Sequence, residues 1–146
     1  MSEIALPDLA AMAALGTRIA ASAQAGDVVA LSGGLGAGKT TLARAILAAL
    51  GHEGEVPSPT FTIVETYDAL CPPVVHADFY RLKHTREAEE IGLDDYRDGA
   101  LLIAEWPECA GGFAHEPECL SIRLEIVGEG RKAIVEPGAA WQGRWL

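Results

Sequence analysis

The sequence predicts a single α/β domain over residues 1–146, with a mostly parallel central sheet, helices on both faces and an antiparallel C-terminal edge. Three observations predict this fold class. Short apolar runs alternate with helix-forming segments, which is typical of strands buried on both faces of a parallel sheet. The last apolar segments instead alternate between apolar and polar residues. A length of 146 residues suits one domain with a sizeable core.

The first half of the chain predicts helix, strand, glycine-rich turn and helix, in that order. Residues 8–25 are rich in alanine and favour a helix. Its apolar face would be formed by Leu9, Met12 and Ile19. Residues 28–31 form a continuous apolar run and predict a buried strand. After the glycine-rich turn, residues 39–50 carry good helix formers with an apolar stripe.

The second half predicts strands joined by loops and one short helix. The strands are expected at residues 61–67, 74–78, 100–104, 120–126 and 133–135. Pro57 and Pro59 exclude regular structure and predict an ordered loop over residues 56–60. Residues 84–91 are acidic and predict a short solvated helix. The last two strands flank a glycine turn and should form an antiparallel hairpin.

The charge of the chain argues against direct binding of nucleic acid. The net charge is −10, from 11 basic and 21 acidic residues, and the excess of acid lies after residue 50. Phosphate backbones are bound by clusters of lysine and arginine, so no autonomous nucleic-acid binding is expected. Any activity on RNA would therefore need a basic partner protein that binds the RNA.

Composition also indicates where the protein resides. No apolar run approaches the roughly 20 residues that span a bilayer, and the first ten residues lack the basic region of a signal peptide. We therefore expect a cytoplasmic protein without a membrane segment. Cys71, Cys109 and Cys119 have no metal-ligand spacing and are expected to be reduced, partly buried thiols.

The strongest chemical signal is the string GGLGAGKT at residues 33–40, which fits the Walker A pattern of GxxxxGK followed by Ser or Thr. Glycines let backbone N–H groups surround phosphate oxygens, and the following helix adds the positive end of its dipole. Lys39 would reach the β- and γ-phosphates, and the Thr40 hydroxyl would ligate Mg²⁺. The motif lies between a predicted strand and a predicted helix, so the sequence predicts a P-loop NTPase-like domain.

Other nucleotides fit the sequence less well than ATP. A dinucleotide site needs the glycines but not the lysine and threonine that follow them. A guanine-reading NKxD string does not occur in the chain. ATP with Mg²⁺ is therefore the expected ligand.

Two acidic residues follow buried strands and are candidates for the chemistry. Glu105 is expected to bind Mg²⁺, and Asp78 is expected to orient or deprotonate the attacking water. The alternative is that each carboxylate only caps a turn in solvent. Arg81 and Arg131 are candidates for stabilising developing charge, and Arg131 could equally be a solvated charge on the hairpin.

The remaining polar residues give weaker signals. Ser58 and Thr60 could sense the γ-phosphate or its metal, or could belong to a rigid proline turn. The surface or packing residues are expected to include His76, His84, Asp94 and Asp95.

Several motifs together resemble the bacterial TsaE family, also called YjeE. They are LSGGLGAGKTTLARAIL, VPSPTFTIVETY, HADFYRL, EIGLDDY and LLIAEWPE, and the resemblance runs from about residue 7 to about residue 136. It implies a small ATPase required for threonylcarbamoyl modification of adenosine next to the anticodon in ANN-decoding tRNAs. It also implies work with the TsaB–TsaD heterodimer, in which TsaD transfers the group and ATP turnover by the small partner resets the complex.

The resemblance also implies roles for individual residues. ATP would be held by Leu35, Gly36, Ala37, Gly38, Lys39, Thr40 and Thr41, with Arg131 touching the nucleotide. Thr40 and Glu105 would ligate Mg²⁺, and Asp78 and Lys39 would support hydrolysis. The chain departs from the family pattern at residues 31–34, LSGG, where relatives often have an acid.

Two other functions remain open on the sequence. A small-molecule P-loop kinase would need a lid with several arginines, whereas Arg86 and Arg97 are sparse and flanked by acids. A nucleotide-gated binding module without useful turnover is hard to separate from a slow ATPase. Slow intrinsic hydrolysis that a partner stimulates is the expected behaviour.

Overall fold

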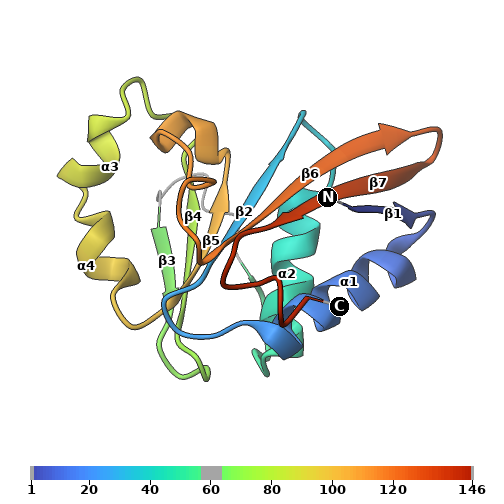
Figure 1. Cartoon of the computed structure of the whole chain (residues 1–146), viewed down its shortest axis with the longest axis horizontal. Helices are drawn as coiled ribbons and strands as arrows, with labels where there is room; N and C mark the ends of the chain where they lie inside the picture. Colours follow the sequence, from blue (N-terminus) through green and yellow to red (C-terminus); the bar gives the residue numbers. More distant parts are fainter. Residues whose placement is uncertain (1, 57–63, 146) are drawn as a thin grey trace.

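The central sheet has seven strands, drawn with the helices in Figure 1. The computed structural model describes residues 2–56 and 64–145. The strands are β1 (Ser2–Leu6), β2 (Val28–Gly33), β3 (Val64–Tyr67), β4 (Val74–Asp78), β5 (Leu101–Glu105), β6 (Cys119–Val127) and β7 (Gly130–Pro137). Their order in the sheet is β1-β7-β6-β2-β5-β4-β3.

The middle of the sheet is parallel and both edges are antiparallel. Strands β6, β2, β5 and β4 pair in parallel, whereas β1–β7, β7–β6 and β3–β4 pair antiparallel. The predicted parallel centre and antiparallel C-terminal hairpin are confirmed. Strand β1 was not predicted, because only Leu6 of its five residues is buried and the segment carries little hydrophobic signal.

Helices cover both faces of the sheet, as predicted. Helices α1 (Leu9–Ser22) and α2 (Lys39–Ala49) lie together on one face, and α3 (Arg86–Glu90) and α4 (Leu93–Arg97) lie on the other (Figure 1). The two apolar clusters of the core follow this division, because alternate residues of β2 belong to different clusters. Strands β2, β4 and β5 are therefore buried along most of their length, whereas β6 keeps Arg123 exposed on the face away from α1 and α2.

Helix α1 is shorter than predicted. Its N-terminus is capped by Asp8, whose side chain accepts a hydrogen bond from Ala11 N at 2.9 Å, and it ends at Ser22 rather than residue 25. Met12 and Ile19 are buried as expected, but Leu9 is 76% exposed. Leu9 lies in the first turn and borders a surface cavity instead of the core, so its place on the buried face was wrong.

Helices α1 and α2 approach closely at Gly16. A Cβ added to Gly16 would lie 2.5 Å from the Cβ of Ala45 and 2.8 Å from its carbonyl carbon. We expect Gly16→Ala to lower the free energy of unfolding by about 1–3 kcal/mol, because an overpacked contact displaces the two helices. Urea denaturation measures the change.

Gly143 provides the matched control for this substitution. It is exposed, and a Cβ built there meets no atom of residues 2–56 and 64–145 within 4 Å. Gly143→Ala should leave the free energy of unfolding within about 0.5 kcal/mol of the unaltered protein. Equal effects of the two substitutions would contradict a specific helix contact at Gly16.

The C-terminal segment is held by side-chain hydrogen bonds at the start of β2. Arg144 donates from both terminal nitrogens to the buried Asp27 carboxylate, at 2.8 and 3.0 Å, and this hydrogen bonding raises the pKa of Arg144. The Trp141 indole N–H donates to the Glu118 carbonyl at 2.6 Å. Asp27 therefore links the segment between α1 and β2 to the C-terminal segment of the chain.

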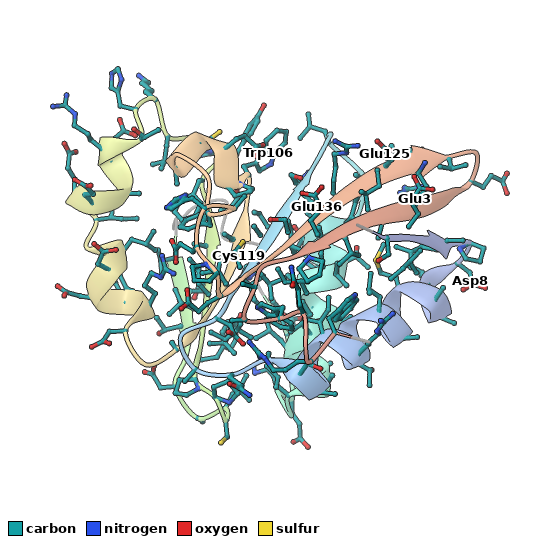
Figure 2. The ribbon with its side chains drawn as sticks, in the orientation of Figure 1. Glu3, Asp8, Trp106, Cys119, Glu125 and Glu136 are labelled. Atoms are coloured by element: carbon teal, nitrogen blue, oxygen red, sulfur yellow. The ribbon has the colours of Figure 1, made fainter. Side chains whose placement is uncertain are left out.

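Two of the three cysteines agree with the expectation of partly buried thiols. Cys109 is partly buried and Cys119 is buried, but Cys71 is exposed, because it lies in the turn before β4. The antiparallel edge carries mixed charges: Figure 2 labels Glu3, Glu125 and Glu136 there, and Lys132 forms ion pairs with Glu3 and Glu125. Within the part of the chain that the structure describes, no helix is long and apolar enough to cross a membrane.

Candidate functional site

The predicted site residues meet at the carboxyl ends of the parallel strands. The glycine-rich loop follows β2, Glu105 ends β5 and Asp78 ends β4. The strand register places Leu31 opposite Glu105 and Asp78 opposite Glu105 across the neighbouring pairs. Residues far apart in sequence are thus brought to one edge, where α/β sheets bind ligands.

The loop between β2 and α2 requires glycine for two different reasons. Gly38 is the N-cap of α2 with a left-handed backbone, φ 106°, and it makes no side-chain cap. Gly33 has φ 135°, and a Cβ there would collide with the Leu124 carbonyl of β6. The uncapped N-terminus of α2 therefore presents backbone N–H groups, which is the geometry that binds phosphate.

Lys39 lies within this loop and is only 6% exposed. Its Nζ donates to the carbonyl oxygens of Gly33 and Gly34, both at 2.8 Å, and lies 4.4 Å from the ring centroid of Trp106. Burial lowers the pKa of Lys39, and the nearby carboxylates of Glu105, Asp78 and Glu108 act in the opposite direction. Contact with an anion would stabilise the charged form of an ammonium group that is desolvated in this way.

Thr40 and Glu105 form a pair of oxygen ligands. The Thr40 hydroxyl donates to Glu105 Oε1 at 2.8 Å, and Glu105 is 2% exposed. One hydroxyl and one carboxylate fit Mg²⁺, which keeps waters and shares its remaining positions with substrate phosphates. In residues 2–56 and 64–145, no cluster of three or more His, Cys, Asp or Glu could hold a metal ion by itself.

Asp78 lies at the end of β4, half-buried beside this pair. Its Oδ1 accepts a hydrogen bond from Tyr80 N at 3.0 Å. Desolvation raises the pKa of Asp78, and the Glu105 carboxylate raises it further, whereas the Tyr80 N–H, His76 and Lys39 lower it. A carboxylate with a raised pKa in a polar cluster is a better proton acceptor than an ordinary surface aspartate.

Trp106 covers the lysine. It has a left-handed backbone, φ 54°, the only positive φ among the described non-glycine residues. Its ring packs on that of Tyr80, with centroids 4.8 Å apart, and Figure 2 labels it at the carboxyl end of β5. Pro107 follows it and starts a 3₁₀ turn (Pro107–Ala110). The left-handed backbone and the contact with Tyr80 together hold the Trp106 ring against Lys39 of the loop.

Arg131 contacts the loop from the opposite side. Its Nη2 donates to the Gly36 carbonyl at 3.0 Å, and its Nη1 donates to the Gly130 carbonyl at 2.8 Å. Arg131 starts from the β6–β7 hairpin, paired with Leu6 of β1. The other candidate, Arg81, is exposed in the turn after β4. The structure therefore brings Arg131 to the loop.

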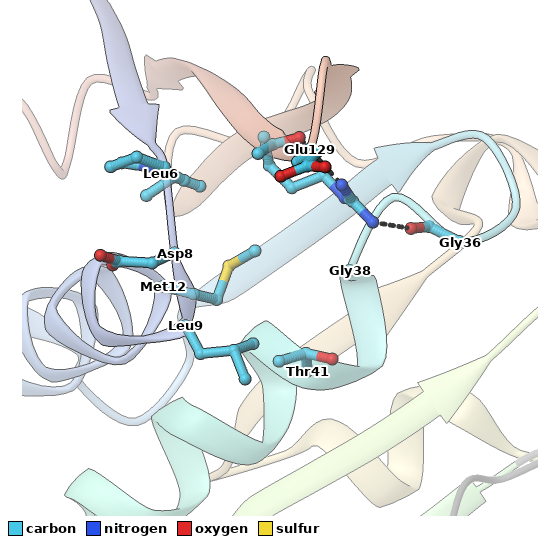
Figure 3. Close-up of a pocket in the computed structure, with 11 residues that line it drawn as sticks. Leu6, Asp8, Leu9, Met12, Gly36, Gly38, Thr41 and Glu129 are labelled. Carbon is cyan, nitrogen blue, oxygen red and sulfur yellow. Dashed lines mark hydrogen bonds between the residues drawn. The ribbon is translucent and has the colours of Figure 1, made fainter.

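A cavity of about 210 Å³ adjoins the loop on this side (Figure 3). Leu6, Leu9 and Met12 form its apolar wall, and Gly36 lies across from them. Arg131, which donates to the Gly36 carbonyl, also lines the cavity. Thr41, the residue after Thr40, also lines it. Apolar side chains facing a planar guanidinium suit a flat heteroaromatic ring.

A comparison with protein-family models identifies the chain. The model for "Threonylcarbamoyl adenosine biosynthesis protein TsaE" matches residues 6–134, which is most of the sequence. The chain belongs to the TsaE family. The predicted resemblance is thereby confirmed, over nearly the range expected.

Individual TsaE proteins are similar over most of the domain. The tRNA threonylcarbamoyladenosine biosynthesis protein TsaE of Streptomyces coelicolor is 46% identical over 100 residues, covering 66% of this chain and 68% of that protein. Its Haemophilus influenzae namesake is 43% identical over 94 residues, covering 64% of this chain. The match spans 60% of the H. influenzae protein, less than two thirds of its length.

A solved structure supports the fold of this TsaE-family chain. The crystal structure of Bacillus subtilis YdiB is similar with a TM-score of 0.80 and 28% identity, covering 98% of this chain and 90% of that one. The predicted α/β architecture is therefore confirmed at the level of the whole domain.

In this TsaE-family chain, His76 is where sequence reasoning about the site was least adequate. It was expected at the surface or in packing, and it is indeed buried, 0% exposed. The contact of its Nε2 with Glu105 Oε2, at 2.6 Å, was not predicted. Its position two residues before Asp78, on the same face of β4, was the available signal.

The remaining residues considered in the sequence of this TsaE-family chain divide into loop residues, surface residues and residues outside the described ranges. Ala37 is buried within the loop, whereas Leu35 is 72% exposed. His84, Asp94 and Asp95 are exposed, as expected. Ser58 and Thr60 lie outside the described residues, as do the start of the predicted strand 61–67 and most of loop 56–60.

Proposed function

We propose that this chain is a Mg²⁺-dependent ATPase that serves threonylcarbamoyl modification of adenosine next to the anticodon in ANN-decoding tRNAs. In this proposal it acts as a switch on the TsaB–TsaD heterodimer. The observation that carries the ATPase part is the convergence of Lys39, Thr40, Glu105 and Asp78 at the N-terminus of α2. The tRNA part rests on membership of the TsaE family.

Nucleotide binding is supported by three features that lie side by side. The N-terminus of α2 and Lys39 suit phosphates, because the helix end presents backbone N–H groups and the Lys39 ammonium donates to the Gly33 and Gly34 carbonyls beside it. The cavity bounded by Met12 and Arg131 adjoins the loop and suits a base. We expect ATP to lie across the loop, with its phosphates towards Lys39.

The metal site would be formed by Thr40 and Glu105. Mg²⁺ supplies positive charge to the phosphate oxygens when it is bound. The chain supplies a hydroxyl and a carboxylate whose positions are set by α2 and β5, both regular elements. Ligands carried on regular elements are held more accurately than ligands on loops.

Asp78 would act on the attacking water. Its Oδ1 is oriented by the Tyr80 N–H, and β4 holds it beside Glu105. The alternative of a carboxylate that only caps a turn in solvent fits poorly, because Asp78 is half-buried among charged groups. We therefore assign it the role of orienting or deprotonating water.

The charge and the arginine geometry favour a partner protein over direct action on RNA. The net charge of −10 disfavours binding to the phosphate backbone of RNA. Arg131 donates to two backbone carbonyls of the chain, so a finger-like arginine is not poised for the γ-phosphate there. We expect slow hydrolysis by the chain alone, and stimulation by the TsaB–TsaD pair.

The raised pKa of Asp78 predicts the pH dependence of hydrolysis. The ionised carboxylate is the active form, so kcat/KM should fall as pH drops through the Asp78 pKa, which lies above the ordinary carboxyl value. Steady-state rates across a pH series measure this decrease of kcat/KM at low pH. A profile that stays flat down to the ordinary carboxyl range would contradict the assignment.

The first test is ATP hydrolysis by the purified chain with Mg²⁺, alone and with the TsaB–TsaD pair, using Lys39→Ala as the blank. Stimulation by the pair that Lys39→Ala abolishes is the expected result. ATP binding without any stimulation would contradict the switch. Phosphoryl transfer to a small acceptor would instead establish a kinase.

A further inference from the structure

The buried contact between His76 and Glu105 has no role in the function proposed so far. We propose that His76 is a positioning residue, which fixes the Glu105 carboxylate in the orientation needed for divalent-metal binding. This inference rests on the proposed function, because it concerns the same metal site. It adds a residue that was expected to serve only in packing or at the surface.

The Glu105 carboxylate is held at both of its oxygen atoms. Oε2 lies 2.6 Å from His76 Nε2, and Oε1 accepts the Thr40 hydroxyl at 2.8 Å. His76 is 0% exposed and Glu105 is 2% exposed. The His76 contact is therefore shielded from water and the Thr40 contact is partly buried, and rotation of the carboxylate would break both of them.

The direction of the His76 hydrogen bond follows from the chemistry of its partner. An ionised carboxylate only accepts, so Nε2 carries the proton and donates to Oε2. Nδ1 is buried and has no hydrogen-bond partner within the described part of the chain. A residue that served packing alone would be apolar, since burying an unpaired polar atom is unfavourable. The Nε2 contact therefore accounts for a histidine at this position.

The sheet holds His76 at a fixed place relative to Glu105. Strands β4 and β5 pair in parallel, with His76 opposite Ile103 and Asp78 opposite Glu105. His76 thus reaches diagonally towards Glu105, two residues further along, and shares a face of β4 with Asp78. The donor is carried on a strand that is hydrogen-bonded on both sides, to β3 and β5, so its position is set by the sheet.

The arrangement predicts a specific effect on metal affinity. Outer partners that orient metal ligands typically contribute 10- to 100-fold to affinity, so loss of the His76 donor should weaken metal binding by about that factor. Phosphate binding by Lys39 and the loop does not use His76 and should be unaffected. Loss of packing alone would lower stability without this selective change.

The experiment compares His76→Gln, His76→Asn and His76→Leu. Glutamine can place an amide N–H near the position of Nε2, asparagine is one methylene shorter, and leucine has no donor. Mn²⁺ binding is measured by electron paramagnetic resonance with a non-hydrolysable ATP analogue present, and analogue binding is measured separately in EDTA. Val75→Ala, a neighbouring buried position on β4, is the packing control.

We expect His76→Leu and His76→Asn to weaken Mn²⁺ binding by about 10- to 100-fold, with analogue binding in EDTA changed by less than about twofold. His76→Gln should recover most of the affinity, and Val75→Ala should retain it. If His76→Leu does not fold, the test is the difference in Mn²⁺ affinity between His76→Gln and His76→Asn.

Two outcomes would overturn the inference, and they differ from failure of the proposed function. Unchanged Mn²⁺ affinity in the His76 variants, or equal affinity of the Gln and Asn variants, would show that the histidine only fills space. Failure of the unaltered protein to bind Mn²⁺ with the analogue would overturn the proposed function itself, together with any positioning role.

Discussion

Replacing Lys39 with methionine should lower ATP turnover by about 100- to 1,000-fold, the usual effect of removing one donor to developing charge. The ammonium group is buried between the Gly33 and Gly34 carbonyls and the Trp106 ring. Methionine retains an unbranched side chain but has no donor or charge. Phosphate release under saturating Mg²⁺ and ATP measures the effect, and nucleotide titration shows the accompanying loss of affinity.

The stability of this variant separates chemistry from folding. Burial lowers the Lys39 pKa, which means that the charged form is disfavoured in the folded protein. Lys39→Met should therefore melt no lower than the unaltered protein. Lys83→Met removes the same charge from an exposed position and should keep full turnover. Normal turnover in Lys39→Met would refute the assignment of the loop as the phosphate site.

Asp78→Asn should lower turnover by about 100- to 10,000-fold, the range attributed to general acid–base groups. Asparagine keeps the shape of the side chain and the oxygen that accepts from Tyr80 N, but it cannot take up a proton. Nucleotide affinity should change by only a few-fold, because Asp78 is assigned to the water and not to the phosphates. Single-turnover hydrolysis and equilibrium binding measure the two quantities separately.

Asp68 provides the control for Asp78. It is exposed in the turn between β3 and β4, beyond the opposite end of β4. Asp68→Asn should leave both quantities unchanged. If Asp78→Asn weakens binding as much as turnover, the residue serves binding, and if neither changes, another group handles the water.

Much of the site could be predicted because its signals are local or topological. The loop, Lys39 and Thr40 are contiguous, and a strand before them and a helix after them were readable from apolar patterns. Glu105 and Asp78 are distant in sequence, but each ends a buried strand. Carboxyl ends of parallel strands share one edge, so their proximity to the loop followed from the fold class.

The residues that escaped prediction depend on contacts between elements. Trp106 was interpreted only as the end of a strand, yet its strained backbone places its ring over Lys39. His76 looked like a packing residue because a single histidine carries no spacing signal. The base-sized cavity combines the β1–α1 junction with the β6–β7 hairpin, segments more than 100 residues apart in sequence.

The sequence by itself determined the fold class, the glycine-rich loop between β2 and α2, the two strand-end acids and the family of this protein. These features are encoded in neighbouring residues or in patterns with a fixed period, which need no knowledge of distant contacts. Only the tertiary structure decided that His76 holds Glu105, that Trp106 covers Lys39 and that β1 completes the sheet. Each of these depends on which side chains meet across the fold, and packing between elements sets that geometry.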